Sequence, residues 1–395
     1  MEIGAGLNRR EFVKTLGAAS AATASGLVLA GPAFGQTPPA PVETNVADFT
    51  KVPRTPRSLP GPFPGRVVKV TDKRSLVDDK FDAKIIGEMF EKGLATLTGK
   101  NLKESFKLLI DPKDIVGIKV NPVGPPLIHT RPETVDAVIK WLVDNGIPKS
   151  NIVIWDRFDY MLKDAGYTAD RFPGIAIEGL QTMDEDEKGT KWKGPDGNHV
   201  SINNFDKDVF YFVKGVVGKG VRGYPSDEFY LNQHVFNGEH SYFGKLLTKK
   251  LTRVINVAAY KNTGPSISMA TKNLGYGSLC NVGRLHGPLS LKVNTEVLAA
   301  PVLRDKVALN ITDGIRAQYD GGPDKNPQFV YLNHSLYFAT DPFALDMLCH
   351  QEINAKRKEM GATVNESPRV TEYLRYAESL GLGVVAADKM QVVKV

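Results

Sequence analysis

The sequence predicts an α/β protein with a mostly parallel sheet flanked by helices and an aromatic-rich insertion. Residues 115–120 and 152–155 form short apolar runs that are typical of buried strands. Between them, residues 130–146 carry apolar side chains at helical spacing, so strand, helix and strand follow one another as in a parallel crossover. Regular patterns return from residue 253 onward, whereas the aromatic-rich stretch at about 178–240 lacks them.

The chain opens with a segment that resembles a twin-arginine export signal. The pair Arg9-Arg10 is followed by Phe12 and a weakly apolar run of Ala, Gly and Ser, and residues 33–35 are small enough for cleavage. The apolar run is shorter than the roughly 20 residues that a membrane-spanning helix needs. We therefore expect residues 1–35 to be a signal for the twin-arginine translocase, and the mature protein to be soluble and periplasmic, with no membrane span.

The next stretch, residues 36–65, is rich in proline and lacks apolar periodicity, which predicts a linker or a strap lying over the domain. A single folded α/β domain is then expected over residues 66–395, with the insertion at about 178–240. Its first elements are a strand at 66–71 and a helix at 82–99 that has one apolar stripe.

The helix at residues 130–146 has clear start and stop signals. Thr130 is the expected cap, Pro132 lies in the first turn, Glu133 follows the cap by three residues, and Gly146 is a suitable stop. In the C-terminal part we expect strands at 253–258, 306–312, 335–340 and 390–395, a helix capped by Asp341 that begins at Pro342, and a last helix from Ser367-Pro368 to Gly381.

Composition narrows the partners and cofactors. The formal charge of +6 is spread over 395 residues without a long basic block, so nucleic acid is not an expected partner. Because the chain has only Cys280 and Cys349 and an iron–sulfur cluster usually needs about four thiolates, such a cluster is disfavoured. The two cysteines could pair in an oxidising compartment, but we favour two unpaired buried thiols. Export of a folded protein favours a bound metal or organic cofactor without identifying it.

Candidate functional residues follow from the sheet, because ligands of open parallel sheets bind outside the carboxyl ends of the strands. Cations outnumber carboxylates at these positions. The residues that follow the four predicted strands are Lys119, Asn121, His129, Thr130, Arg131, Asp156, Arg157, Tyr260, Lys261, Asn262, Asp313 and Arg316.

The stretch "ATKNLGYGSLCNVGRLHG", residues 270–287, extends the third of these sets. Its glycines permit close approach of a ligand to the backbone, and its cations favour an anionic one. We expect substrate binding by Lys119, Arg131, Lys261, Lys272, Asn273 and Arg284, and proton transfer by Asp313, His286 and Asp156. The alternatives are a solvated loop with ordinary surface cations, a His286 bonded to backbone in a turn, and an Asp313 that caps a turn.

A divalent metal is a weaker expectation, and no metal ligands are assigned. Asp156, Asp313 and Asp320, together with His129 or His286, have the oxygen and nitrogen donors that such an ion prefers. However, the sequence has no His-x-x-x-His or paired-cysteine spacing to support such a site. Cys280 as a nucleophile with His286 as its base is a further, disfavoured reading.

Several segments together resemble the domain of unknown function 362 family over about residues 66–390. They are "GIKVNP", the helix "TRPETVDAVIKWL" followed by "NIVIWD", the segment "INVAAYK…ATKNLGYG", "ITDGIRAQYDGGP" and "FATDPFALDMLCHQ". Several members of that family carry an added ferredoxin-like cysteine cluster, which this chain lacks. The resemblance therefore implies a domain and not a reaction.

Two functions remain open at this point. The first is an enzyme that acts on a small anionic substrate, with or without a divalent metal, in which Lys and Arg hold the anion while Asp or His moves a proton. The second is a periplasmic binding or accessory protein that captures an anion, a metal or a redox partner without catalysis.

Overall fold

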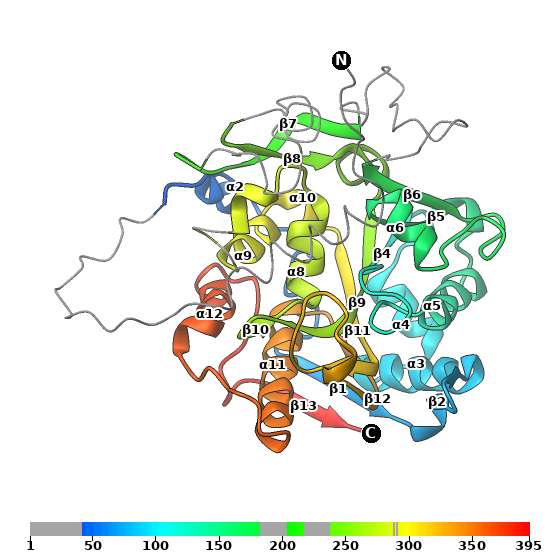
Figure 1. Ribbon diagram of the computed structural model, residues 1–395. Helices are drawn as coiled ribbons and strands as arrows, with labels where there is room; N and C mark the ends of the chain where they lie inside the picture. Colours follow the sequence, from blue (N-terminus) through cyan, green and yellow to red (C-terminus); the bar gives the residue numbers. More distant parts are fainter. Residues whose placement is uncertain (1–41, 182–203, 217–237, 287–288, 290) are drawn as a thin grey trace, which may run out of the picture.

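The computed structural model describes residues 42–181, 204–216, 238–286, 289 and 291–395, and a nine-stranded sheet forms its centre (Figure 1). The expected signal at residues 1–35 lies outside the described residues. The strands of the sheet, in spatial order, are β13 (Gln391–Lys394), β1 (Arg66–Thr71), β12 (Val330–Ala339), β11 (Val307–Gln318), β9 (Arg253–Thr263), β4 (Val116–Val120), β5 (Ile152–Phe158) and β6 (Ala176–Gln181), with β10 (Ser266–Ile267) paired to β9.

The sheet is mostly parallel. Strands β11, β9, β4, β5 and β6 run parallel to one another, and β1 runs parallel to β13. The antiparallel pairings of this sheet are those of β12 with β1 and β11 and of the short β10 with β9. Together with the helices on both faces, this arrangement confirms the α/β class predicted from the sequence.

Alternating side chains of the strands divide the core between the two faces of the sheet. Ile152 and Ile154 of β5 belong to the core under one helical layer, whereas Val153 and Trp155 belong to the core under the other. The first layer is formed by α3 (Ala83–Thr98), α4 (Leu102–Leu109) and α5 (Pro132–Asp144), and the second by α8 (Ala270–Gly275), α9 (Lys292–Leu298), α10 (Pro301–Arg304), α11 (Pro342–Glu359) and α12 (Glu372–Ser379).

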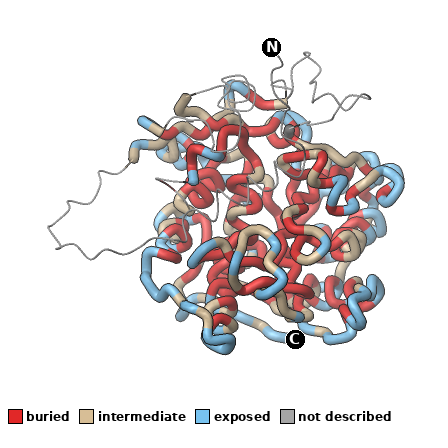
Figure 2. The backbone as a smooth tube through the Cα atoms, viewed as in Figure 1, coloured by how far each residue is buried: buried red, intermediate tan, exposed pale blue. Residues whose placement is uncertain are grey.

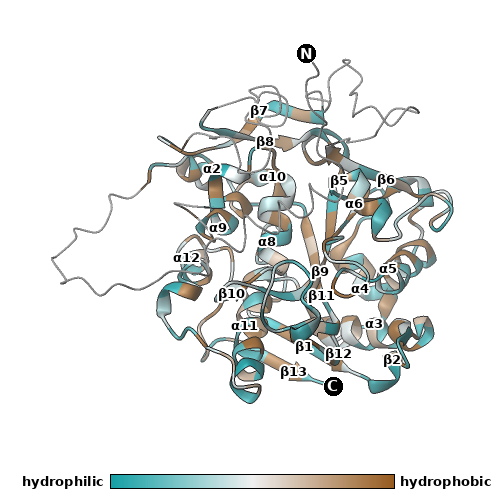
Figure 3. Ribbon diagram, in the orientation of Figure 1, coloured by the Kyte–Doolittle hydropathy of each residue, from teal (hydrophilic) through white to brown (hydrophobic). Residues whose placement is uncertain are grey.

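Burial follows this layering. Figure 2 shows the buried residues concentrated in the middle of the molecule, and Figure 3 shows hydrophilic residues along the outer surfaces of the helices. Strands β9 and β11 are buried along almost their whole length, including the polar residues that interrupt their apolar runs.

Smaller elements complete the fold. Strands β7 (Phe205–Phe212) and β8 (His240–Gly244) pair with each other as a separate antiparallel ribbon, at the top of Figure 1. This ribbon lies within the expected insertion, and residues 178–181, the first of that stretch, complete β6 of the main sheet. The hairpin expected around Pro195 lies outside the described residues. The other short elements are α2 (Val46–Lys51), β2 (Leu76–Val77), β3 (Lys80–Phe81) and α6 (Asp159–Asp164).

Residues 42–65 lie against the second helical layer as a strap. The guanidinium of Arg304 donates hydrogen bonds to the carbonyl oxygens of Phe49 and Val52 at 3.2 and 3.1 Å, and to that of Pro53 at 3.0 Å. Leu59 is fully buried, and its N–H donates to the Arg304 carbonyl at 2.7 Å.

Two local predictions were wrong. The N-cap of α5 is Arg131 instead of Thr130, because the Thr130 hydroxyl donates to the carbonyl of Val257 in β9 at 2.6 Å. Strands β9 and β11 also continue past their expected ends, so Lys261 and Asp313 lie within strands instead of after them. Pairing of β11 with β12 continues beyond Asp313 and holds the chain extended there.

No helix in the described part of the chain is long and apolar enough to cross a membrane.

Candidate functional site

The carboxyl ends of β4 and β5 meet α8 at a buried ion pair. The Lys119 ammonium is fully buried and donates to an Asp156 carboxylate oxygen, to the Asn273 side-chain oxygen at 2.8 Å and to the Val120 carbonyl at 2.8 Å. All three of its N–H donors are therefore used inside the protein. Burial lowers the pKa of Lys119, and Asp156 opposes this effect. Three residues predicted from the sequence, Lys119, Asp156 and Asn273, thus lie together and hold one another.

A row of asparagines continues this network across the sheet. The Asn273 amide donates to Asn256 of β9 at 2.8 Å, the Asn256 amide donates to Asn310 of β11 at 3.0 Å, and the Asn310 amide donates to the Thr340 carbonyl at 3.1 Å. Lys119, Asn256 and Asn310 are neighbours in the strand register. Because every link is buried, the row fixes α8 on the sheet.

Gly277 covers the Lys119 side chain. A Cβ atom at this position would lie 2.6 Å from Lys119 Cε and 2.9 Å from its Nζ. The glycine of the short 3₁₀ turn η5 (Tyr276–Ser278) is therefore required by the close approach of backbone to a buried lysine.

A second buried lysine, Lys261 of β9, lies near the first. Its ammonium donates to the Asn121 side-chain oxygen and to the Val123 carbonyl, both at 3.1 Å. Burial, followed by the positive charge of Lys272, lowers the pKa of Lys261 to about 7. Near neutral pH, the Lys261 amine is therefore present in both its protonated and its unprotonated form.

Lys272 differs from both of these lysines. It is partly exposed, its Nζ lies 5.5 Å from the centre of the Tyr276 ring, and no hydrogen-bond acceptor for it is present among the residues that the structure describes. Burial lowers its pKa to about 8. The Lys272 amine thus has no hydrogen-bond acceptor among the described protein atoms.

His286 also packs against the Tyr276 ring. The two ring centres are 4.5 Å apart, and His286 Nδ1 lies 3.1 Å from the Val282 carbonyl, which makes Nδ1 the donor of a neutral imidazole. Burial, and then the positive charge of Lys272, lowers the pKa of His286 to about 4. With the proton on Nδ1, Nε2 is the nitrogen whose lone pair can accept a proton. The alternative that it bonds backbone in a turn is correct for Nδ1 only.

Arg157 completes what we call the strand-end cluster: Arg157, Lys261, Lys272 and His286. The positive charge of Arg157 also lowers the pKa of His286, after burial and the charge of Lys272. Its Nε is buried without a hydrogen-bond partner, and its guanidinium lies 4.8 Å from the Phe158 ring. The sequence places Arg157 at a strand end, but the expected substrate-binding residues do not include it. Its position beside Asp156 was the available signal.

Arg131 and Asp313 lie elsewhere, at the start of α5. Asp313 accepts the Arg131 N–H at 2.9 Å and the Thr134 hydroxyl at 2.8 Å, so this carboxylate caps the helix from β11. The Arg131 guanidinium donates to the carbonyls of Pro126 at 2.7 Å and Leu127 at 2.5 Å, and therefore closes the loop before the helix. The Asp313 carboxylate thus has protein donors, and the terminal nitrogens of Arg131 have protein acceptors, whereas its buried Nε has none.

Arg284 is also separate from the cluster. Its guanidinium donates to the Val216 carbonyl at 2.8 Å and to the Ser241 hydroxyl at 2.9 Å, and so ties the turn η6 (Gly283–His286) to the β7–β8 ribbon. A role for Arg284 in holding this ribbon follows directly from these bonds.

The carboxylates considered for a metal do not lie together. Asp156 pairs with Lys119, Asp313 caps α5, and Asp320 pairs with Arg357 at 3.1 Å. Among the described residues there is no group of three or more His, Cys, Asp or Glu side chains that could hold a metal ion.

Both cysteines are free and buried, as the sequence analysis favoured. Burial raises the pKa of Cys280 to about 12, so its thiol stays protonated at neutral pH. Cys280 is therefore unsuited to act as a nucleophile with His286.

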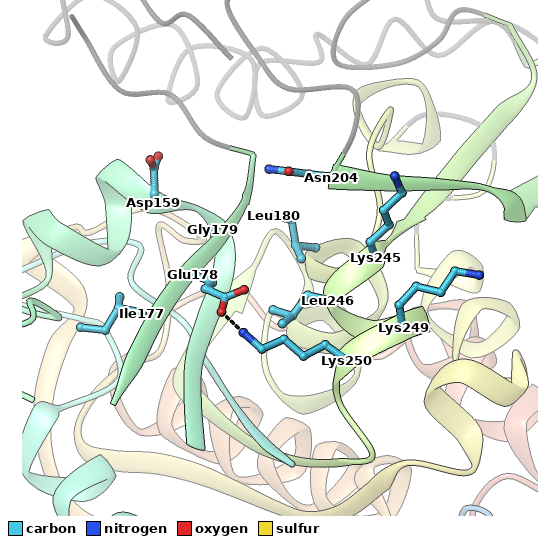
Figure 4. A pocket seen from close by; sticks show the side chains of 10 residues that line it. All are labelled: Asp159, Ile177, Glu178, Gly179, Leu180, Asn204, Lys245, Leu246, Lys249 and Lys250. Atoms are coloured by element: carbon cyan, nitrogen blue, oxygen red, sulfur yellow. Dashed lines mark hydrogen bonds and ion pairs between the residues drawn. The ribbon is translucent and has the colours of Figure 1, made fainter. Parts of the chain in front are cut away.

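A cavity of about 560 Å³ lies between β6 and residues 245–250, and Asp159, two residues after Arg157, also lines it (Figure 4). Lys250 of its lining forms an ion pair with Glu178, drawn as a dashed line, and Lys249 pairs with Asp206 at 3.1 Å. Sequence reasoning gave no signal for this cavity, whose lysines lie in an apolar-and-basic stretch without a motif.

The strand-end cluster combines free cationic donors with a neutral imidazole, which is an arrangement suited to holding an anion and moving a proton. No curated protein and no solved structure matches this chain. Residues 231–351, which include Lys261, Lys272 and His286, match the family model described as Domain of unknown function (DUF362), and this match confirms the resemblance expected from the sequence over that segment.

Proposed function

We propose that this protein is an exported, periplasmic enzyme that acts on a small anionic substrate at the strand-end cluster. The observation that carries the proposal is the absence, among the described residues, of an acceptor for either the Lys272 ammonium or the Arg157 guanidinium. Buried or half-buried cations in folded proteins normally have oxygen partners, as Lys119 and Lys261 do here. An anionic ligand would provide the missing oxygens.

Electrostatics favours an anion at this position. The positive charge of Lys272 lowers the pKa of Lys261, and the charges of Lys272 and Arg157 both lower the pKa of His286. Asp156, whose charge acts on Lys261 in the opposite direction, is already engaged by Lys119. A carboxylate or phosphate bound between these cations would relieve their repulsion and raise the pKa of Lys261 and Lys272.

Proton transfer is assigned to His286. Its Nδ1 donates to the Val282 carbonyl, so Nε2 is the nitrogen that can accept a proton. Asp156 acts indirectly, because it holds Lys119 and through it Asn273, the residue next to Lys272. Asp313 has no part in this proposal, because its oxygens already accept bonds from α5. A divalent metal is likewise left out, since Asp313 and Asp320 are engaged by other residues.

The second candidate is a periplasmic binding or accessory protein that captures the same anion without turnover. The free cations support both functions equally, whereas the neutral, accessible imidazole of His286 favours catalysis.

The test is a thermal-shift titration of the full chain with phosphate, sulfate, malonate and lactate. We expect at least one of these anions to raise Tm, and we expect Lys272→Met and Arg157→Gln each to abolish most of the rise. Lys245→Met, at an exposed lysine of the cavity, is the matched control and should leave the rise unchanged. Equal shifts in all four proteins would contradict the proposal.

A further inference from the structure

Lys272 is the one buried or half-buried lysine of the strand ends whose amine the described residues leave without an oxygen partner. Lys119 donates three hydrogen bonds and Lys261 donates two. Lys306, which is partly buried elsewhere, also donates to two backbone carbonyls. The Lys272 amine instead lies over the Tyr276 ring, at 5.5 Å from its centre, and remains partly accessible.

The surroundings of Lys272 favour its neutral form. Burial opposes a charge on its amine, and this burial lowers the pKa to about 8. In addition, no carboxylate in the described part of the chain pairs with it, while Lys261 and His286 lie close enough to respond to its charge. A lysine that is both desolvated and next to other cationic groups is an activated nucleophile, because a larger fraction of the amine is unprotonated at neutral pH.

We propose that Lys272 forms an imine with the carbonyl carbon of a short oxo acid whose carboxylate is bound by Arg157. This inference rests on the proposed anion site and specifies its substrate class. A carbonyl is the electrophile that a neutral amine attacks reversibly, and a neighbouring carboxylate meets the unpartnered guanidinium.

The chemical step is balanced within the site and solvent. The Lys272 nitrogen attacks the carbonyl carbon, a C–N bond forms, and the electron pair of the C=O double bond moves to oxygen, which takes up a proton. Transfer of a proton from nitrogen to His286 Nε2 and from there to the departing hydroxyl then releases water and leaves the C=N bond. No oxidant or reductant is consumed.

The test is chemical trapping on the full chain with pyruvate as the probe. Protein incubated with pyruvate is treated with sodium borohydride, which reduces an imine irreversibly to an amine, and is then examined by intact mass and peptide mapping. We expect one reduced adduct per chain, located on Lys272, and at least a tenfold lower yield in Lys272→Arg. Lys245→Arg, the control at an exposed lysine, should retain the full yield.

The outcomes separate this inference from the proposed function. If lactate raises Tm but pyruvate with borohydride gives no adduct on Lys272, the imine is refuted and the anion site stands. If none of phosphate, sulfate, malonate, lactate and pyruvate raises Tm and no adduct forms, both are refuted. An adduct on Lys261 in place of Lys272, or equal labelling of many surface lysines, would also refute the inference. A Tm of Lys272→Arg close to that of the unmodified chain shows that its lower yield does not come from unfolding.

Discussion

Removal of the Asp156 carboxylate should destabilise the protein strongly, by an amount that depends on pH. In Asp156→Ala, Lys119 stays fully buried with two neutral oxygen partners, Val120 and Asn273, and no counter-charge. Breaking a buried ion pair by removing one partner typically costs about 3–5 kcal/mol.

The chemistry of lysine sets an upper limit on this loss. Lys119 can escape its unpaired charge by releasing its proton, and from an ordinary pKa of 10.5 this release costs about 4.8 kcal/mol at pH 7, at about 1.36 kcal/mol for each pH unit. At pH 9 the same release costs only about 2 kcal/mol. Because the unfolded state then binds more protons than the folded variant, the variant gains stability relative to the unmodified chain as pH rises.

Urea denaturation at pH 7, 8 and 9 measures this effect. We expect a loss of about 3–5 kcal/mol at pH 7 that falls to about 2 kcal/mol at pH 9. Asp136→Ala is the control, because Asp136 and Arg171 form an exposed pair whose loss should cost less than about 1 kcal/mol at every pH. A loss in Asp156→Ala that is below 1 kcal/mol, or that does not change with pH, would refute the assignment of a charged, buried pair.

Three further predictions follow from other parts of the fold. Burial lowers the pKa of His129 to about 3, so the unfolded state binds the proton first, and stability should fall by about 1.4 kcal/mol per unit as pH drops from 6 to 4; His129→Gln should remove that part of the slope. Asp313→Ala should cost about 1–3 kcal/mol in urea denaturation by uncapping α5, yet leave the anion-induced Tm shift intact; loss of that shift would return Asp313 to the site. Gly93→Ala places a Cβ 2.2 Å from the Phe338 ring and should cost about 1–3 kcal/mol, whereas Gly87→Ala in the same helix meets nothing within 4 Å and should stabilise by about 0.5–1 kcal/mol; equal effects would contradict the packing.

Much of the fold could be predicted because its signals are local. Asp341 and Ser367 each accept backbone N–H bonds at the start of a helix or turn, where the sequence places helix starts. Apolar runs such as 152–155 identify strands because both faces of the sheet are covered.

The errors arose where a distant residue decides the local structure. Thr130 has the sequence of a cap, but its hydroxyl bonds β9, and the cap comes from Asp313, 183 positions later in the numbering than Thr130. Strand ends were placed too early because the pairing with β12 that extends β11 cannot be read from β11 itself.

The candidate site shows the same limit in its side chains. Residue type and position selected Lys119, Lys261 and Lys272 alike as cations at strand ends, and nothing in the sequence separates them. In the structure, the three lysines differ in their hydrogen-bond acceptors. The ammonium groups of Lys119 and Lys261 donate to oxygen atoms, whereas that of Lys272 has no acceptor among the described residues. A buried Nε without a partner does not separate Arg157 from Arg131 and Arg284, but the terminal nitrogens of Arg131 and Arg284 donate to backbone carbonyls.

The placement of Lys272 follows from the rigidity of α8. At the start of this helix, Asp346 of α11 accepts the N–H groups of Ala270 and Thr271, both at 2.9 Å, and the Thr271 hydroxyl at 2.6 Å. One residue beyond Lys272, Asn273 is fixed between Lys119 and Asn256. Lys272 therefore projects from a helix whose preceding and following residues are both anchored by buried polar contacts, so its unpaired amine cannot be attributed to a loosely held segment. In a buried polar network, each polar group normally has a hydrogen-bond partner. The Lys272 amine is the exception among these neighbours, and it is the group that an incoming anion or carbonyl would meet.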